Sequence, residues 1–149
     1  MHSETLYAQF HQQADQAIGV KLFTVMVVDN EAGLSRRAYT SHPEEYPTSG
    51  SKPLRKDDRW SQQVLVEQQC FIANSTAGFA DVFPDHALIN ELGCESVINV
   101  AIVDGGEVIG TVNCLDVADH FDEARVATLL KLIDAQRADL IAAIRSASF

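Results

Sequence analysis

The sequence predicts an α+β domain built around one central antiparallel sheet of five to six strands. Three observations indicate this fold class. Residues 92–117 read as two long strands joined by a tight turn, residues 20–29 are apolar at nearly every position, and both ends of the chain carry amphipathic helical patterns, over 3–18 and 122–146. Because each apolar face must be buried against another layer, we expect the terminal helices to cover one face of the sheet. The segments between 42 and 92 should cover the other face.

The N-terminal part of the chain predicts a helix followed by a β-hairpin. Apolar residues recur at helical spacing through residues 3–18, and Gly19 stands where a helix commonly ends. The apolar run that follows is typical of a central strand, because both of its faces need cover. Residues 34–41 should be its hairpin partner. Arg36 and Arg37 favour an edge position for this second strand, since charged side chains discourage further pairing.

Residues 42–56 form the long irregular segment of the sequence and contain three of its four prolines. A loop of this length in a compact domain usually carries a function or lacks order. Tyr46 within it has an aromatic ring with a polar end, which suits closing over a ligand and pinning the loop to the body equally well. The region also carries four cations interrupted by two aspartates, a pattern typical of a solvated loop rather than a phosphate site. These cations are Lys52, Arg55, Lys56 and Arg59.

Two short helices and one short strand are expected after this loop. Asp57 or Asp58 is placed to cap a helix that extends to about Gln69. Residues 70–74 read as a short strand, and a helix over 84–92 begins with a proline, as helices often do. Together with the loop, these elements should form the layer opposite the terminal helices.

The hairpin at residues 92–117 combines one apolar face with one face of small and amide side chains. Asp104-Gly105-Gly106 tolerates the positive φ angles that a two-residue turn requires. Alternation places on the apolar face Ile98, Val100, Ile102, Val108, Val112 and Cys114. It places on the opposite face Val97, Asn99, Ala101, Ile109, Thr111, Asn113 and Leu115. A sheet needs a core on one side only, so we expect a site on the second face. There the two asparagines should bond either to a ligand or to each other.

The C-terminal pattern predicts one helix of about 24 residues, capped by Asp119 or Asp122. Four residues widen its apolar stripe, namely Ala124, Ala127, Leu132 and Ala143. A stripe of this width can pack on the sheet and on a second copy of itself. We therefore predict a homodimer that forms through the terminal helices.

Composition and charge argue against several partners. The net charge of −10 and the pI near 4.7 leave nothing to offset phosphate repulsion, which argues against a nucleic-acid partner. The sequence contains no apolar run near the roughly 20 residues of a membrane span, and its first residues lack the pattern of a signal peptide. Cys70, Cys94 and Cys114 are odd in number and form no CxxC pattern, which favours reduced thiols in the cytoplasm.

The chain resembles a GAF domain, a small-molecule sensory fold related to PAS. The resemblance rests on SVINVAI at residues 96–102 and GGEVIGTVN at residues 105–113. These segments match the family pattern S-V-x-x-V-P-hydrophobic followed by G-x-hydrophobic-hydrophobic-G-x-hydrophobic. Ala101 departs from it, because the family most often has proline there. The resemblance covers about residues 10–145 and implies that residues 1–149 form a single, stand-alone GAF domain.

This resemblance implies a pocket on the sheet face opposite the terminal helices, with the segment between the second strand and the hairpin as its lid. It also implies that an unknown small metabolite binds there and that the role is sensory or regulatory. The residues expected to line the pocket are Tyr39, Ser41, Tyr46, Trp60, Asn74, Phe79, Phe83, Asn99, Thr111 and Asn113.

The same family includes a short enzyme, free methionine-(R)-sulfoxide reductase, which supplies an alternative function with Cys94 as the candidate nucleophile. Cys94 lies only two residues before Ser96, closer than in that enzyme's motif, and the acidic residue of the following strand is absent. A Cys-His pair for bilin attachment is also absent, and only the tail of the cyclic-nucleotide motif, Phe121-Asp122-Glu123, is present. The histidines show no metal-ligand spacing. We expect no cofactor and no metal, and a cytoplasmic module without catalysis of its own.

Overall fold

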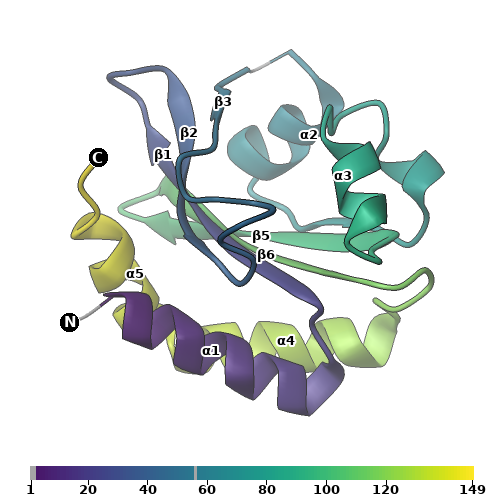
Figure 1. The fold of residues 1–149 in the computed structure, drawn as a ribbon. Coiled ribbons are helices and arrows are strands. Elements are labelled where there is room, and N and C mark those ends of the chain that lie inside the picture. Colours follow the sequence, from purple (N-terminus) through teal and green to yellow (C-terminus); the bar gives the residue numbers. More distant parts are fainter. Residues whose placement is uncertain (1–2, 56) are drawn as a thin grey trace.

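A computed structural model describes residues 3–55 and 57–149 and confirms the α+β architecture (Figure 1). Six strands form one antiparallel sheet in the order β3-β2-β1-β6-β5-β4. Their bounds are β1 (Leu22–Asp29), β2 (Leu34–Thr40), β3 (Ser51–Pro53), β4 (Phe71–Ala73), β5 (Ser96–Asp104) and β6 (Glu107–Asp116). β1 and β6 therefore lie at the centre of the sheet, which agrees with the apolar character of both strands.

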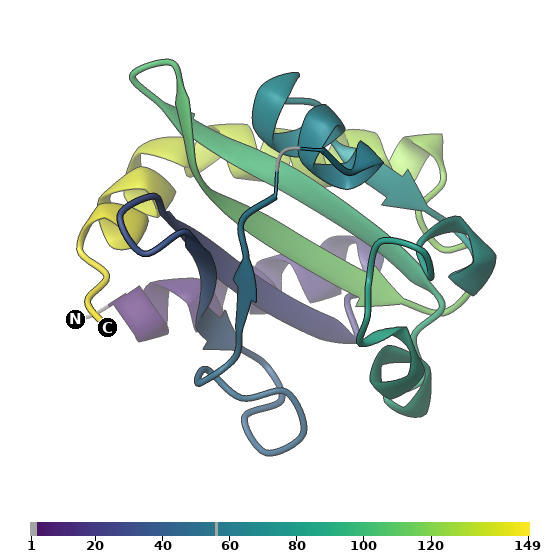
Figure 2. The ribbon, with the colours of Figure 1, turned by 90° about the horizontal axis from the view of Figure 1, so that it is seen from above.

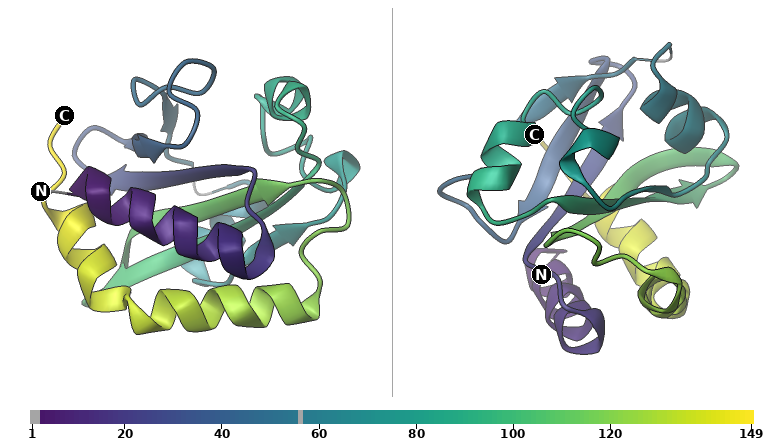
Figure 3. Two further views of the ribbon diagram at one scale, coloured as in Figure 1. Left: turned by 60° about the horizontal axis from the view of Figure 1, so that its bottom comes forward. Right: turned by 90° about the vertical axis from the view of Figure 1, so that its right-hand side faces the viewer.

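Two layers of different construction cover this sheet (Figures 1 and 3). The layer on one face consists of α1 (Ser3–Ile18), α4 (Glu123–Ala135) and α5 (Arg137–Arg145). The layer on the other face consists of α2 (Arg59–Ser61), the π-helical turn η1 (Gln62–Val66), the 3₁₀ turn η2 (Thr76–Gly78) and α3 (His86–Glu91). As predicted, the terminal helices cover one face of the sheet and elements within residues 42–92 cover the other. Within the described residues, no helix is both long and apolar enough to cross a membrane.

The helix-covered face holds the larger apolar core. Phe10 of α1 and Phe23 of β1 are fully buried, with ring centroids 5.7 Å apart. Ile133 of α4 and Ile144 of α5 reach the same cluster, so all three helices contribute to it. Cys114 of β6 is fully buried in this core, as alternation along the strand predicts.

The β5–β6 hairpin turns through two residues only, Gly105 and Gly106. Their φ angles are +62° and +82°, which a primed two-residue turn requires and which glycine adopts without strain. This two-residue turn sets the pairing of β5 and β6, the two longest strands.

A bulge near this turn overturns one detail of the predicted alternation. The register shifts between the pairs Ile102–Gly110 and Val103–Val108, which leaves Ile109 as the extra residue. Ile109 consequently packs in the helix-side core and Val108 packs on the opposite face, the reverse of the prediction. Gly110 leaves no room for a side chain, because a Cβ there would lie 2.4 Å from a backbone carbonyl oxygen of β1.

The prediction that β2 is an edge strand was wrong. β3, which lies inside the segment expected to be irregular, pairs with β2 and takes the edge. Arg36 bonds to Asp29 at 3.0 Å, so its charge is paired on the sheet surface. Arg37 is buried and donates from Nη1 to the carbonyl oxygen of Pro47 at 2.6 Å, so it holds the following loop.

The C-terminal pattern forms two helices rather than one continuous helix. Asp122 caps α4 by accepting a hydrogen bond from the backbone N–H of Arg125 at 2.9 Å. Gln136, with φ −116° and ψ 15°, then separates α4 from α5, and its side chain bonds to Gln13 of α1. The change of direction, visible in Figure 3, lets both helices keep their apolar residues on the same sheet face.

Candidate functional site

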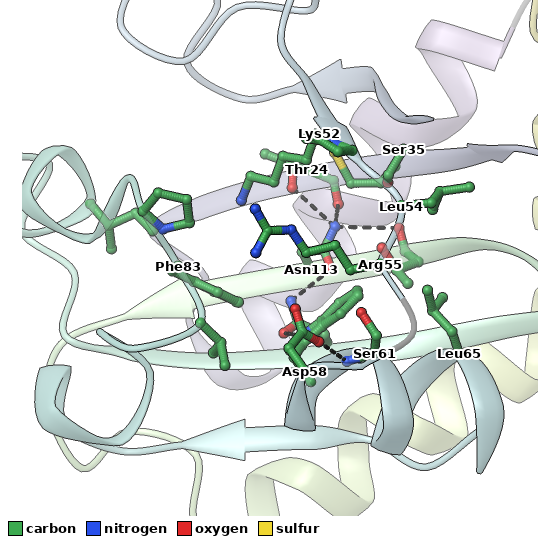
Figure 4. Close-up of a pocket in the computed structure, with 18 of the residues that line it drawn as sticks. Thr24, Ser35, Lys52, Leu54, Arg55, Asp58, Ser61, Leu65, Phe83 and Asn113 are labelled. Atoms are coloured by element: carbon green, nitrogen blue, oxygen red, sulfur yellow. Dashed lines mark hydrogen bonds between the residues drawn. The ribbon is translucent and has the colours of Figure 1, made fainter. Parts of the chain in front are cut away.

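A cavity of about 300 Å³ lies between the sheet and the layer formed by residues 42–92. Figure 2 looks down on this layer, where short helices and irregular segments surround the central strands. The floor comes from β1, β5 and β6, while α2 and η1 supply one wall and residues 80–84 supply another. Residues 52–55 close over the cavity from β3 and the chain after it (Figure 4).

A row of polar side chains crosses three neighbouring strands on this floor. Thr24 lies directly opposite Asn113, and Asn113 lies directly opposite Asn99. Asn99 Nδ2 donates to Asn113 Oδ1 at 2.7 Å, and Asn113 Nδ2 donates to Thr24 Oγ1 at 3.2 Å. All three are buried, and each unpaired polar group there would cost about 1–3 kcal/mol. Of the two alternatives left open by the sequence, the amides bond to each other.

Trp60 joins one wall of the cavity to this row. Its Nε1–H donates to Asn99 Oδ1 at 2.8 Å. Asp58 positions the indole from the preceding turn, because its carboxylate accepts the backbone N–H of Ser61 at 2.6 Å and so caps α2. Leu65 of η1 and Phe83 add further apolar surface to the lining of the cavity. The cavity is therefore mostly apolar, with a few fixed polar groups on its floor.

A charged cluster lies at the opposite side of the cavity, where Tyr46 and Lys52 line it. The Tyr46 hydroxyl donates to one oxygen of Asp85, and Lys52 Nζ donates to the other at 3.4 Å. Burial, reinforced by the neighbouring carboxylate, raises the pKa of the Tyr46 phenol, while burial lowers the pKa of the Lys52 ammonium. Arg37 lies with its guanidinium carbon 3.7 Å from the centroid of the Tyr46 ring. Asp85 immediately precedes α3, and its carboxylate binds these side chains instead of capping that helix.

Comparison with protein families identifies this fold. A family model for the GAF domain matches residues 3–135. The chain belongs to the GAF domain family. GAF domains are small-molecule sensory and regulatory domains. A comparison with curated proteins found no significant match.

Solved GAF structures share this architecture at low sequence identity. The GAF domain/HD domain protein of Geobacter sulfurreducens superimposes with a TM-score of 0.73 at 12% identity, covering 94% of this chain and 93% of that one. The GAF domain of a two-component sensor histidine kinase from Bacillus halodurans gives 0.68 at 13% identity, covering 91% and 93%. The GAF domain of an Acinetobacter phosphoenolpyruvate-protein phosphotransferase gives 0.66 at 16% identity, covering 93% and 81%. These likenesses show the fold.

Six of the ten residues expected at the pocket line the cavity of this GAF domain. They are Tyr46, Trp60, Phe83, Asn99, Thr111 and Asn113. Phe79 lies one layer further out, fully buried against Phe83 with ring centroids 5.4 Å apart. It supports the wall without reaching the cavity.

Three further expected residues lie elsewhere, and each has a structural partner. Tyr39 pairs with Val25 across the strands and therefore faces the terminal helices, where its ring packs on Phe23. Ser41 follows β2, and its hydroxyl accepts the backbone N–H of Phe23 at 2.9 Å. Asn74 bonds at both ends of its amide to the backbone of Phe121, which anchors β4 near the start of α4. None of these three lines the cavity.

Sequence reasoning missed several lining residues of this GAF pocket. Thr24 and Met26 alternate along β1 and share the register of Asn113 and Thr111, so pairing the strands in the correct register would have revealed them. Lys52 was placed in a solvated loop, and it lines the cavity because β3 pairs with β2. Of the same basic cluster, Arg59 bonds to Asp81 at 2.7 and 3.0 Å, Arg55 lines the cavity, and Lys56 lies outside the described residues.

The three thiols give no support to the reductase alternative. Cys94 is fully buried, and burial, with a smaller effect of Asp116, raises the pKa of its thiol to about 11. Burial also raises the pKa values of Cys70 and Cys114. A protonated, buried thiol is a poor nucleophile, and none of the three lines the cavity. In the described part of the chain, no cluster of three or more histidine, cysteine or acidic side chains is arranged to hold a metal ion.

Proposed function

We propose that this GAF domain binds a small, partly apolar metabolite in the cavity and acts as a sensory or regulatory module without catalysis of its own. The observation that carries the proposal is the cavity of about 300 Å³ between the sheet and residues 42–92. Ligand pockets usually begin at about this size and combine apolar walls with few polar groups. Trp60 and Phe83 supply such walls, and the Asn99–Asn113 row supplies such polar groups.

Mass spectrometry of the supernatant from heat-denatured protein tests this proposal. We expect a small molecule to be released stoichiometrically from the native protein. Ala80 lines the cavity, so Ala80→Phe should fill part of it and abolish the release. Ala77→Phe is the matched control, because Ala77 is exposed in the same turn and does not line the cavity. Equal release from both variants would contradict binding in this cavity.

The homodimer is the second part of the proposal. α4 presents exposed Ala124 and Ala127 and half-buried Leu132 beside the helix-side core, which supports a helix-to-helix contact. Ala143 belongs to the core itself and does not contribute to this surface. Ala127→Arg should convert a dimer to a monomer in size-exclusion chromatography with light scattering. Ala77→Arg, an equally exposed substitution on the opposite side of the sheet, should leave the mass unchanged.

The cytoplasm is the proposed location. All three cysteines are free thiols, and free thiols are usual where the compartment is reducing. We propose no nucleic-acid partner, because the chain carries 21 acidic against 11 basic residues.

A further inference from the structure

The charge around the cavity is opposite in sign to the charge of the chain. The chain carries a formal net charge of −10, yet two cations, Lys52 and Arg55, line the mouth of the cavity. Figure 4 shows both side chains reaching over the cavity from neighbouring positions of one segment. The feature to explain is this local positive charge on an acidic protein.

The two carboxylates that line the cavity do not neutralise these mouth cations. Asp58 accepts the backbone N–H of Ser61 at 2.6 Å and serves as the cap of α2. Asp81 is bound by both Nε and Nη2 of Arg59, at 3.0 and 2.7 Å. Each carboxylate therefore has its own donor, and neither bonds to Lys52 or Arg55.

The charges that surround Lys52 also sum to a positive value. Lys52 shares the single carboxylate of Asp85 with the Tyr46 hydroxyl. Arg37 is 6% exposed, and its Nε has no hydrogen-bond partner within the described residues. Two cations thus stand beside one anion, in surroundings where burial lowers the pKa of the Lys52 ammonium. An additional negative charge at this wall would be stabilised by both cations.

Arg55 is the second cation at the cavity. It is exposed, lines the cavity, and makes no hydrogen bond or ion pair within residues 3–55 and 57–149. A guanidinium is a five-donor group whose planar fork matches carboxylate, phosphate and sulfonate oxygens. As far as the described residues go, all of its donors are available to a ligand that enters between residues 52–55 and the floor.

We propose that the metabolite bound by this domain is an organic anion with an apolar body, and that Lys52 and Arg55 hold its charged group. The inference rests on the proposed function, since it specifies the ligand class of the same cavity. The apolar body follows from the walls, where Trp60, Leu65, Phe83 and Ile89 surround the space below the cations. An inorganic anion would leave this apolar surface uncovered.

A matched pair of fluorescent probes tests the inference on the intact protein. The first probe is the anionic dye 1-anilinonaphthalene-8-sulfonate, and the second is N-phenyl-1-naphthylamine, which has the same aromatic body without the sulfonate. Trp60 is the single tryptophan of the chain and lines the cavity, so energy transfer from it reports a bound dye, and Ala80→Phe, which fills part of the cavity, should remove the signal of a dye bound there. We expect the anionic dye to bind more tightly than the neutral dye, and its affinity to fall in high salt.

Two variants remove the cations, and a third serves as control. Lys52→Met should weaken the anionic dye by about fivefold and Arg55→Met by about threefold, as expected for partly screened ion pairs. Both variants should leave the neutral dye within about twofold of its wild-type affinity. Lys131→Met removes an exposed cation of α4 and should change neither affinity. Arg55 has no partner to lose, so Arg55→Met keeps the test valid if Lys52→Met does not fold.

The outcomes separate the inference from the proposed function. If both dyes accept energy from Trp60 but Lys52→Met and Arg55→Met leave the anionic dye unchanged, the anion inference is overturned and the binding cavity stands. The same holds if the variants weaken both dyes equally, or if the neutral dye binds more tightly. If neither dye accepts energy from Trp60, the proposed function fails, and the inference fails with it.

Discussion

The two faces of the sheet are built from alternate residues of the same strands, yet they are covered in different ways. On the helix-covered face, Phe10, Phe23 and Ile133 are each 0% exposed and pack in one apolar core. On the opposite face, Asn99 and Asn113 stand beneath a cavity of about 300 Å³. Long helices bring continuous apolar stripes to the sheet, whereas short helices and loops must also satisfy their own backbone groups. The elements that cover a face, more than the strands beneath them, therefore determine whether a cavity remains between the two layers.

The largest contrast between the faces is expected in the cost of deleting an aromatic ring. Phe10→Ala should lower the free energy of unfolding by about 3–5 kcal/mol, because rigid helices cannot close the space. Phe83→Ala should cost less, roughly 2 kcal/mol, since its ring borders the cavity and the space it leaves would join one that is already open. Urea denaturation followed by circular dichroism measures both. Equal losses would contradict the difference in packing between the two faces.

A second effect concerns the polar row on the pocket face. Asn113→Leu leaves Asn99 Nδ2 without its acceptor and Thr24 Oγ1 without its donor, and should cost about 1–3 kcal/mol. Asn99→Leu should cost a similar amount, because Trp60 also loses its acceptor. The two asparagines act as a unit, so a double-mutant cycle should return a coupling energy of about 0.5–3 kcal/mol. Losses that simply add would show that the row is not a connected network.

The sequence predicted the architecture well because its strongest signals are local. The Gly105-Gly106 turn set the hairpin, and alternation along β5 correctly placed Asn99 on the pocket face and Ile98 on the helix face. The helical spacing in α1 correctly indicated its buried residues, including Phe10. Each of these depends on residues within a few positions of one another, where periodicity is informative.

The errors arose where a contact distant in sequence decides the outcome. A register shift between Val25 and Met26 turns Tyr39 toward the helices, and nothing local marks the extra residue. β3 forms from Ser-Lys-Pro, a sequence with little strand preference, because β2 offers it an edge. Lys52 reaches the cavity only through that pairing, so this cation could not be placed at the cavity from its neighbours in sequence.

A third prediction concerns the contact between the end of β4 in the sheet and the start of α4 in the helix layer. Asn74 receives the backbone N–H of Phe121 at 2.9 Å and donates to its carbonyl oxygen at 3.1 Å, which ties β4 to the start of α4. Asn74→Ala should cost about 1–2 kcal/mol of unfolding free energy, since both bonds are lost. Because Asn74 does not line the cavity, dye binding reported by Trp60 should stay unchanged. A weaker dye affinity in the folded variant would contradict this and show that Asn74 contributes to binding.

The smallest expected effect is a gain in stability, and it compares one buried hydroxyl on each face. The Tyr7 hydroxyl, on the helix face, is buried and has no hydrogen-bond partner among the described residues, whereas the Tyr46 hydroxyl bonds to Asp85. Tyr7→Phe should therefore raise the free energy of unfolding by up to about 1 kcal/mol at neutral pH, and Tyr46→Phe should lower it.

The pH dependence of the free energy of unfolding gives a second check on Tyr7. Burial raises the pKa of Tyr7 from 10.0 to about 12, so the unfolded chain loses this proton first. The stability linked to Tyr7 is complete below pH 10.0 and is lost as the pH rises to about 12. The advantage of Tyr7→Phe over the native protein should consequently widen across that interval in urea titrations. A constant difference would mean that water reaches the Tyr7 hydroxyl in solution and that burial does not raise its pKa.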